Sequence, residues 1–331
     1  MFLDRRWIKL MIVLLLLNVL IFLCSVALGN RDIPFLDAWA TALGWGNDTY
    51  AFTIRQLRLP RIWTGFLAGC GLALSGAVLQ VVTRNPLASP GVIGINSGAA
   101  AAVVSVLVLV PSFPIRQLPV VAFVGALAAV AVIYGLAWRK GGTMERMLLA
   151  GVAISAMAGA WITYLLTVGQ VFRISQAYIW MAGSLYARTW DHVWSLLPWM
   201  AVLFPVVLLY ARRLDLLQLN DVSASGLGIK LDSTRMVLIL ISAGLAGAAV
   251  SMAGTIAFVG LMAPHMATRL AGSRNLKRLP AAALLGGALV MLSDLAGRML
   301  FPPFELPVGL ITALIGAPYM LHLLLRRPTA L

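Results

Sequence analysis

The chain is poor in charge and in the residue types that catalysis uses. Only 11% of its 331 residues are charged, against about a quarter in a soluble domain, and 61% are hydrophobic. It has two glutamates, Glu145 and Glu305, and three histidines far apart in the sequence. None of its four lysines lies in a G-x-x-x-x-G-K-[ST] loop. These shortages exclude a soluble protein and give no support to an enzyme, a nucleotide hydrolase, a metal site or a cofactor.

Cysteine is scarce as well, and its placement argues against a disulfide. Cys24 and Cys70 both lie inside apolar segments, where a free cysteine behaves as a small hydrophobic side chain. The net charge of +14 could suggest nucleic acid as a partner. The cations instead flank apolar segments, which is the pattern that orients membrane helices, and no nucleic-acid motif occurs. We therefore expect the lipid bilayer, and no nucleic acid, as a partner.

Long apolar runs are what the sequence has in excess. A run of about twenty residues spans a hydrocarbon core of roughly 30 Å as a helix. The alternation of apolar and polar residues typical of a membrane β-barrel does not occur. The predicted fold is all-α, a polytopic helical membrane protein with a single transmembrane domain over residues 1–331. Candidate spans lie near 8–29, 62–82, 93–111, 118–138, 147–168, 193–211, 281–301 and 307–325.

The N-terminal segment, residues 1–30, has the basic start and apolar core of a signal peptide. Its apolar core runs for about twenty residues, beyond the usual length of about 7–15 in a signal peptide. We interpret it as the first membrane helix.

Residues 236–268 are harder to assign. They carry no acidic or basic side chain except His265, and one straight helix through them would be about 50 Å long, too long for one crossing. An even number of crossings keeps the Arg269–Arg278 cluster on the cytoplasmic side with the other cations. We predict two short or interrupted helices here, ten crossings in all and both termini in the cytoplasm. The cytoplasmic side then holds 17 of the 25 Lys and Arg residues: Arg5, Arg6, Lys9, Arg84, Arg139, Lys140, Arg146, Arg212, Arg213, Lys230, Arg235, Arg269, Arg274, Lys277, Arg278, Arg326 and Arg327.

A polar segment, residues 214–235, separates two apolar runs and is expected inside the cell. It is much longer than a turn that reverses a membrane helix needs to be. Leu214, Leu217 and Val222 form an apolar stripe at helical spacing, and a Gly-Leu-Gly step follows. We predict two short amphipathic helices at right angles that dock another protein. The alternative is a solvated loop.

Two further features concern the route through the membrane. Pro86 and Pro90 interrupt any helix in residues 84–100, and broken backbone at membrane depth is tolerated only against protein or a watery cavity. This segment is predicted to line the route or to pack beside it, and the alternative is a plain turn. Asp294 and Arg298 lie four residues apart on one helix face and are predicted to pair. The alternative is that Asp294 couples transport to protons.

Six short motifs occur in the order found in a known family. They are RLPR (58–61), SGAVLQ (75–80), NPLASPGVIGINSGA (85–99), LLAGVA (148–153), FVGLMAPH (258–265) and ELPVGLITALIGAP (305–318). From about residue 50 onward the chain resembles the FecCD/BtuC-type permease family of bacterial ATP-binding-cassette importers for iron-siderophores, haem and vitamin B12.

The resemblance implies a ten-helix permease subunit in the bacterial inner (cytoplasmic) membrane. Its implied partners are a second permease subunit, either identical or a paralogue, and two ATPase subunits that hydrolyse ATP. A periplasmic or lipid-anchored substrate-binding protein would deliver the cargo. The chain itself would be a transporter subunit and not an enzyme.

The resemblance also implies roles for particular residues. The segment 214–235 would be the pair of coupling helices that fit each ATPase, through Leu217, Asp221, Ala224, Leu227 and Gly228. The family often has glutamate where this chain has Asp221, which keeps the charge. The inner gate would lie at Thr143, Met144 and Glu145, the outer mouth at Trp180 and Ser184 in WMAGSL, and the path beside Asn85, Pro86 and Pro90.

Eight cations are expected to face outward: Arg31, Arg55, Arg58, Arg61, Arg116, Arg173, Arg188 and Arg298. The resemblance implies that Arg58 and Arg298 pair with glutamates of the binding protein, an interaction that favours orientation and association rate. Arg61 could instead be an interfacial residue whose charge reaches the membrane surface.

The cargo is inferred less directly. The RNPLASP stretch and the LDLLQL start of the polar segment resemble permeases for ferric citrate and catecholate siderophores. An iron(III)-siderophore complex is therefore the predicted cargo, with vitamin B12 or haem as the alternative. A proton-coupled secondary transporter and a membrane scaffold without transport activity remain as rival functions.

Overall fold

The computed structural model describes residues 4–29, 33–45, 48–138 and 143–325, and the regular secondary structure of these residues is helical. The first half contains α1 (Arg5–Ala27), α2 (Phe35–Leu43), α3 (Asp48–Ala51), η1 (Phe52–Arg58), α4 (Leu59–Val82), α5 (Ile95–Leu109), η2 (Ile115–Gln117), α6 (Leu118–Trp138) and α7 (Met144–Val168). The second half contains α8 (Val171–Met181), α9 (Trp190–Leu209), α10 (Ala211–Leu217), α11 (Asp221–Gly226), α12 (Leu231–Ala253), α13 (Val259–Ala271), α14 (Asn275–Met299) and α15 (Val308–Leu325). Five cations assigned to a side from sequence lie outside the described residues: Arg31, Arg139, Lys140, Arg326 and Arg327.

Seven helical segments in the described ranges are long and apolar enough to cross a membrane: Arg5–Ala27, Thr49–Val82, Ile115–Trp138, Met144–Val168, Trp190–Leu209, Leu231–Ala253 and Asn275–Met299. Two shorter apolar helices, α5 and α15, accompany them. The all-α prediction is therefore confirmed. The predicted ten crossings would need α5, α13 and α15 as well, and both that count and the location of the termini stay predictions.

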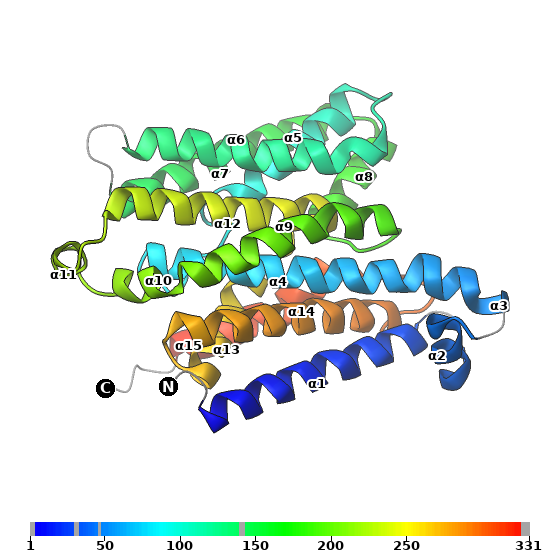
Figure 1. Cartoon of the computed structure of the whole chain (residues 1–331). Coiled ribbons are helices and arrows are strands. Elements are labelled where there is room, and N and C mark those ends of the chain that lie inside the picture. Colours follow the sequence, from blue (N-terminus) through cyan, green and yellow to red (C-terminus); the bar gives the residue numbers. More distant parts are fainter. Residues whose placement is uncertain (1–3, 30–32, 46–47, 139–142, 326–331) are drawn as a thin grey trace.

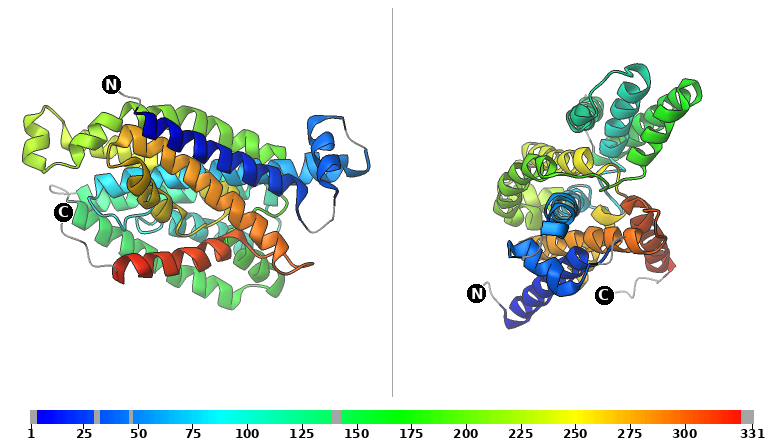
Figure 2. Two further views of the ribbon diagram at one scale, coloured as in Figure 1. Left: turned by 90° about the horizontal axis from the view of Figure 1, so that it is seen from below. Right: turned by 90° about the vertical axis from the view of Figure 1, so that its right-hand side faces the viewer.

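The membrane helices run side by side along one direction, with α4 at the centre. Figure 1 shows α5, α6 and α7 above α12, α9 and α4, with α14, α15 and α1 below them. The end-on view in Figure 2 shows the same order of layers. Because α4 packs against α14, α12, α13 and α9, nearly all of its side chains from Ile62 onward are buried.

Glycine permits the close approach of α4 to its neighbours. A Cβ atom at Gly69 would lie 2.2 Å from the carbonyl oxygen of Gly286 in α14. A Cβ at Gly76 would lie only 1.6 Å from the carbonyl oxygen of Gly260 in α13. Small residues let helix backbones meet in this way inside a bilayer, where apolar burial by itself drives little association.

The expectation of two short helices within 236–268 was wrong for the first of them. α12 has 23 residues because it begins at Leu231, so its polar first turns, with Asp232 and Arg235, belong to the helix and not to the preceding loop. It ends at Gly254, whose φ of +73° suits glycine and whose Cβ position lies 2.4 Å from a backbone oxygen of α8. α13, with 13 residues, is the short helix of the pair.

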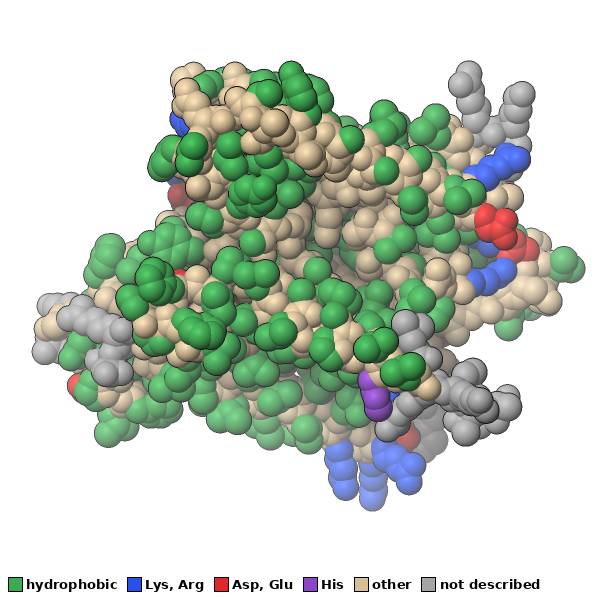
Figure 3. Space-filling view, turned by 180° about the vertical axis from the view of Figure 1, so that it is seen from behind, with side chains coloured by type: hydrophobic (Ala, Val, Ile, Leu, Met, Phe, Trp, Pro, Cys, Tyr) green, Lys and Arg blue, Asp and Glu red, His purple; other side chains and the backbone are tan. Residues whose placement is uncertain are grey.

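The two ends of the bundle differ. At one end, on the left in Figure 1, α10 lies against the bundle and α11 projects from it beside the start of α12; we call this the α11 end. At the opposite end lie α2, α3 and α8; we call this the α2 end. Seen from behind, the flank between the ends is mainly apolar, and many of the visible charged side chains gather toward the α11 end (Figure 3).

A single methyl group should disturb the centre of this bundle. Gly76→Ala places its Cβ against the Gly260 carbonyl, so α4 and α13 must move apart, and we expect unfolding free energy to fall by about 1–3 kcal/mol, the usual effect of overpacking. The thermal unfolding midpoint of the purified protein in detergent measures this. Gly135→Ala is the matched control, because no other atom lies within 4 Å of its Cβ position. Equal midpoints for the two variants would contradict the packing.

Candidate functional site

The two small helices at the α11 end are held to the bundle by an ionic contact. The Asp221 carboxylate, at the start of α11, accepts hydrogen bonds from Arg84 Nη2 at 2.6 Å and Arg235 Nη2 at 2.7 Å. Arg84 follows α4 and also donates to the carbonyls of Leu217 and Leu219, the first at 2.9 Å. One arginine therefore joins α4, α10 and α11, while Arg235 adds α12.

These contacts also explain the ionisation of Asp221. Partial burial raises the pKa of its carboxyl, but the hydrogen bonds and charges of Arg235 and Arg84 outweigh burial and leave the pKa below its ordinary value. A carboxyl whose pKa is lower in the folded than in the unfolded protein stabilises the fold fully at any pH above the unfolded-state pKa. This stabilisation is lost as the pH falls through the folded-state pKa. The ion pairs therefore stay formed at neutral pH.

The first small helix is held just as firmly. Asp215 in α10 accepts hydrogen bonds from the backbone N–H of Asn275 at 2.7 Å and from its side-chain Nδ2 at 2.8 Å, so it supplies an acceptor at the first turn of α14. The side chains of Leu214 and Leu217, both residues of α10, are buried. Within α11, the side chain of Asn220 caps the helix by accepting the Ser223 N–H at 2.7 Å.

The apolar stripe predicted for the polar segment divides in the structure. Leu217 and Ala224 are buried, whereas Val222 is 84% exposed and Leu227 is 60% exposed. Val222 therefore does not share a face with Leu214 and Leu217, because α10 and α11 are separate helices with their own orientations. The exposed pair, Val222 and Leu227, leaves an apolar surface on the outside of this projection.

The residues predicted to form the inner gate and path lie toward the same end. Thr143 caps α7 by accepting the Arg146 N–H at 3.3 Å, with Met144 and Glu145 in the first turn. Asn85 accepts the Leu87 N–H at 2.9 Å in the loop between α4 and α5.

The two prolines of that loop differ in their surroundings. Pro86 is exposed, whereas Pro90 is buried against Gly260 of α13. Pro90, Ile93 and Gly94 of this loop are buried and lead into α5, so this part of the broken backbone packs against protein, whereas Val92 is 40% exposed.

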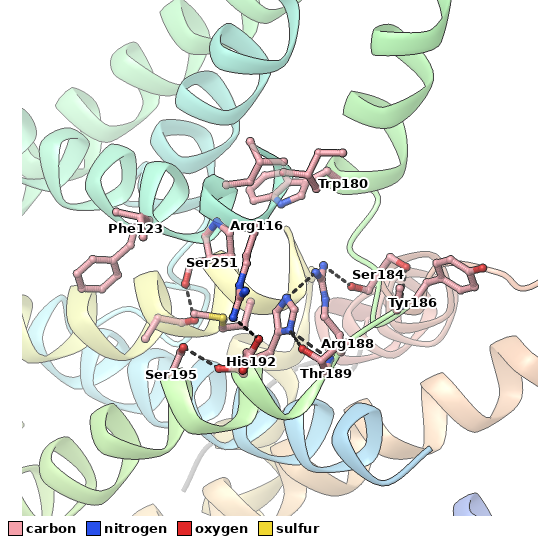
Figure 4. Close-up of a pocket in the computed structure, with 18 of the residues that line it drawn as sticks. Arg116, Phe123, Trp180, Ser184, Tyr186, Arg188, Thr189, His192, Ser195 and Ser251 are labelled. Carbon is pink, nitrogen blue, oxygen red and sulfur yellow. Dashed lines mark hydrogen bonds and ion pairs between the residues drawn. The ribbon is translucent and has the colours of Figure 1, made fainter. Parts of the chain in front are cut away.

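Trp180 and Ser184, the residues predicted at the outer mouth, lie toward the α2 end and are not brought together with the others. Both line a cavity of about 1140 Å³ between α6, α8, α9 and α12, shown in Figure 4. Trp180 is near the C-terminus of α8. Ser184 is fixed by a hydrogen bond from its backbone N–H to the Ala253 carbonyl at 2.9 Å.

A buried charge network crosses the bundle near the α2 end. Asp294 and Arg298 form the predicted pair, with Arg298 Nε 3.1 Å from Asp294 Oδ2. Arg61 of α4 completes it, because its Nη2 lies 2.8 Å from Asp294 Oδ1 and its Nη1 lies 2.6 Å from Glu305 Oε2. The side chains of Asp294 and Arg298 are 5% and 4% exposed, so the two carboxylates compensate buried cations.

Arg58 and Arg298, which were expected on the outer side to dock a partner, are buried, and both bind the end of α1. Arg58 Nη1 donates to the carbonyls of Val26 at 2.7 Å and Ala27 at 2.9 Å. Arg298 donates to the carbonyls of Ser25 and Leu28, each within 3.3 Å. The last carbonyls of a helix carry partial negative charge and lack partners within the helix, so two arginines satisfy them well. Docking of a partner on Arg58 and Arg298 stays a prediction, and it would require the end of α1 to move away.

Sequence reasoning missed three contacts at these sites. Arg84 and Arg235 were counted only as inside cations, although both hold Asp221. Arg61 was given an interfacial position, although it is buried and links two carboxylates. In the sequence, the four-residue spacing of Asp294 and Arg298 was the one signal of a contact in this network, because their other partners lie far away in the chain.

Comparison with known proteins now identifies the fold. The model of the FecCD transport family matches residues 15–326. The chain belongs to this family. FecCD members with similar sequences include an Fe(3+)-citrate import system permease protein of Bacillus subtilis, 40% identical over 95% of each chain. An Fe(3+) dicitrate transport system permease protein of Escherichia coli is 37% identical and covers 92% of this chain and 94% of its own. A hemin transport system permease protein of Yersinia pestis is 39% identical and covers 95% of this chain and 94% of its own.

A solved structure agrees with the FecCD fold. A transporter assigned to the metal-chelate ABC type, in an inward-facing conformation, superimposes with a TM-score of 0.85 and 27% identity. The match covers 97% of this chain and all of the other. This FecCD chain is therefore a multi-pass membrane protein of the ABC permease class, a class whose members are not themselves the enzymes.

The charge network should be needed for stability. Asp294→Asn removes the carboxylate shared by Arg61 and Arg298, and we expect unfolding free energy to fall by about 3–5 kcal/mol because a buried pair is broken from one side. Chemical unfolding in detergent measures this change. Asp191→Asn breaks the exposed pair with Arg116 and should cost less than about 1 kcal/mol. If Asp294→Asn kept normal stability but lost transport, the proton-coupling alternative would be favoured.

Proposed function

We propose that the chain is the permease subunit of an ATP-binding-cassette importer that moves an iron(III)-siderophore or iron(III)-citrate complex across the bacterial cytoplasmic membrane. Separate ATPase subunits supply the energy, and a second permease subunit, identical or a paralogue, completes the membrane channel. A binding protein outside the membrane delivers the cargo. The family, the structural match at 27% identity and the names of the relatives support this function.

The single observation that carries the proposal is the projection made by α10 and α11. It combines an exposed apolar surface, at Val222 and Leu227, with firm anchoring on the bundle by Asp221 and Asp215. A partner that grips such a projection can move the helices behind it, because the contacts leave little freedom for the projection to bend alone. We assign ATPase coupling to this projection, with Asp221, Leu217 and Ala224 holding its shape.

Alternating access follows from this arrangement. A force on α10 and α11 reaches α4 through Arg84 and α12 through Arg235. α4 and α12 in turn extend toward the α2 end, so closure of the ATPases at one end is converted into movement at the other. The predicted inner gate at α7, Thr143–Glu145, lies beside the projection, where such a movement begins.

The cargo class rests on the relatives and is tested separately from the coupling. The relatives include permeases named for citrate and for hemin at similar identity. Unlabelled ferric catecholate siderophore should reduce the uptake of labelled ferric citrate. Unlabelled ferric citrate should likewise reduce the uptake of the labelled siderophore. Competition by hemin alone would instead assign the chain to the haem branch.

An acidic substitution on the exposed surface of α11 should uncouple the importer. Val222→Asp puts a charge on the apolar contact without touching the bundle, since the side chain is 84% exposed. We expect at least a tenfold loss of ATPase co-purification and of ATP-driven ferric chelate uptake in vesicles, the size of effect expected when a contact residue at the centre of an interface is lost. The protein level should stay normal.

Leu36→Asp is the matched control, because Leu36 is 81% exposed on α2 at the opposite end. It should leave ATPase co-purification unchanged. Full uptake by Val222→Asp would contradict the coupling role. Uphill uptake in the absence of nucleotide, driven by a proton gradient, would sink the proposal as a whole and favour a secondary transporter.

A further inference from the structure

The cavity near the α2 end has the chemistry of a binding site for an amphiphilic anion. Its volume of about 1140 Å³ is enough for a small molecule, since such pockets usually measure about 300–1,000 Å³. One side of its lining is apolar and aromatic, and the other carries positive charge. Coupling at α11 does not use it.

The apolar part of the lining comes from four helices, α6, α8, α9 and α12. α12 packs against both α6 and α9 and forms the back of the cavity through Ala248 and Met252. Phe123 of α6 and Trp199 of α9 meet in front of it, with their ring centroids 4.7 Å apart. Trp180 adds a further aromatic surface from α8, as Figure 4 shows.

The polar part of the lining contains a cation without a matching anion. Arg188 donates to the Ser184 carbonyl at 3.1 Å and lies 3.3 Å from His192 Nε2, but its buried Nε has no hydrogen-bond partner among the described residues. Nor does Arg188 belong to any ion pair in that part of the chain. In Figure 4 its guanidinium lies beside His192 within the cavity lining.

The surroundings of Arg188 make its charge costly. Burial and the nearby positive charge of Arg61 lower the pKa of Arg188 to about 10, so the guanidinium is still charged at neutral pH. Arg188 is partly buried, and a partly buried charge that lacks an opposite charge is less stable than a compensated one, a cost that a bound anion removes. A second cation, Arg116, lines the same cavity and pairs with the exposed carboxylate of Asp191, at 2.7 Å.

We propose that this cavity binds an oxyanion, a carboxylate or a phosphate, carried on an apolar or aromatic body, with Arg188 as the principal anion contact and Arg116 as the second. Two sources supply this chemistry. An anionic lipid can enter sideways between α6 and α9, where Val120 and Trp194 line the cavity and are also exposed. A soluble anionic iron chelate can enter past the loop at 184–189. The inference does not depend on the transport function, because binding is measured without transport.

The experiment uses the full chain in nanodiscs and has two arms. In the first, native mass spectrometry counts phosphatidylglycerol retained from mixed phosphatidylglycerol and phosphatidylcholine nanodiscs. In the second, equilibrium dialysis measures binding of iron-55 citrate to the protein in pure phosphatidylcholine nanodiscs. Binding in the first arm alone identifies a lipid, binding in the second alone identifies a chelate, and binding in both shows a site that accepts either.

The variants locate whichever anion binds. Arg188→Gln should weaken binding about tenfold or more, the size of effect expected when one charge-assisted hydrogen bond is lost. Arg188→Lys keeps the charge and should lose less. Arg173→Gln is the matched control, since Arg173 is a cation on α8 outside the cavity lining, and it should bind as the wild type does.

A second variant guards against misfolding at Arg188. Ser195 is exposed on α9 and lines the cavity, so Ser195→Trp places an indole ring inside it without disturbing the core and should weaken binding with an unchanged unfolding midpoint. The proposal is overturned if neither anion is retained above its neutral or zwitterionic background. It is equally overturned if Arg188→Gln and Ser195→Trp both bind like the wild type.

Discussion

The contact on which the rest of this structure depends is the approach of the α4 backbone to those of α13 and α14. At Gly76 and Gly69 there is no room for even one methyl group. An apolar side chain gains no free energy when it leaves lipid tails to pack against another helix. Helices in a bilayer are therefore stabilised mainly by close backbone packing. The position of α4 is thereby determined, and each end of α4 leads to one of the charged sites.

The two ends of α4 use arginine in different ways. At the α2 end, Arg61 is buried with two carboxylates, and Arg58 satisfies the last carbonyls of α1. These contacts hold three helices and a loop in one arrangement. At the α11 end, Arg84 is partly exposed and reaches out to Asp221 and to two backbone carbonyls of the projection. A buried network of ion pairs resists rearrangement, whereas a partly exposed one can transmit a displacement while its hydrogen bonds stay formed. This contrast agrees with a rigid bundle that is driven from one end.

The charged groups near the α2 end differ in how well they are compensated. Arg61 and Arg298 share Asp294, but Arg188, which is close enough to Arg61 to feel its charge, has a carbonyl and a histidine nitrogen as its partners within the described residues. A partly buried charge without an opposite charge is costly, and a bound anion removes that cost. The large cavity beside Arg188 gives that anion a place to bind.

Composition and local spacing were enough to predict an all-helical membrane protein, most of its spans, the small helices α10 and α11, and the pairing of Asp294 with Arg298. These features depend on hydropathy over one span or on residues a turn apart, which one chain segment contains by itself. The family resemblance, carried by short motifs such as RLPR and FVGLMAPH, was confirmed by the match to the FecCD family model over residues 15–326. Where α12 begins was missed, because a polar first turn looks the same as a loop in sequence.

Only the tertiary structure decided which arginines are buried and what they bind. Arg58 was expected to be available to a docking protein, but it is buried against the end of α1, where it donates to the carbonyl of Val26, 32 residues earlier in the chain. Arg61 meets Asp294 across 233 residues of sequence, and Val222 is exposed although it follows the spacing of buried leucines. No local pattern can contain such pairs, because the packing of distant helices sets which charges come within hydrogen-bonding distance and which side chains lose contact with solvent.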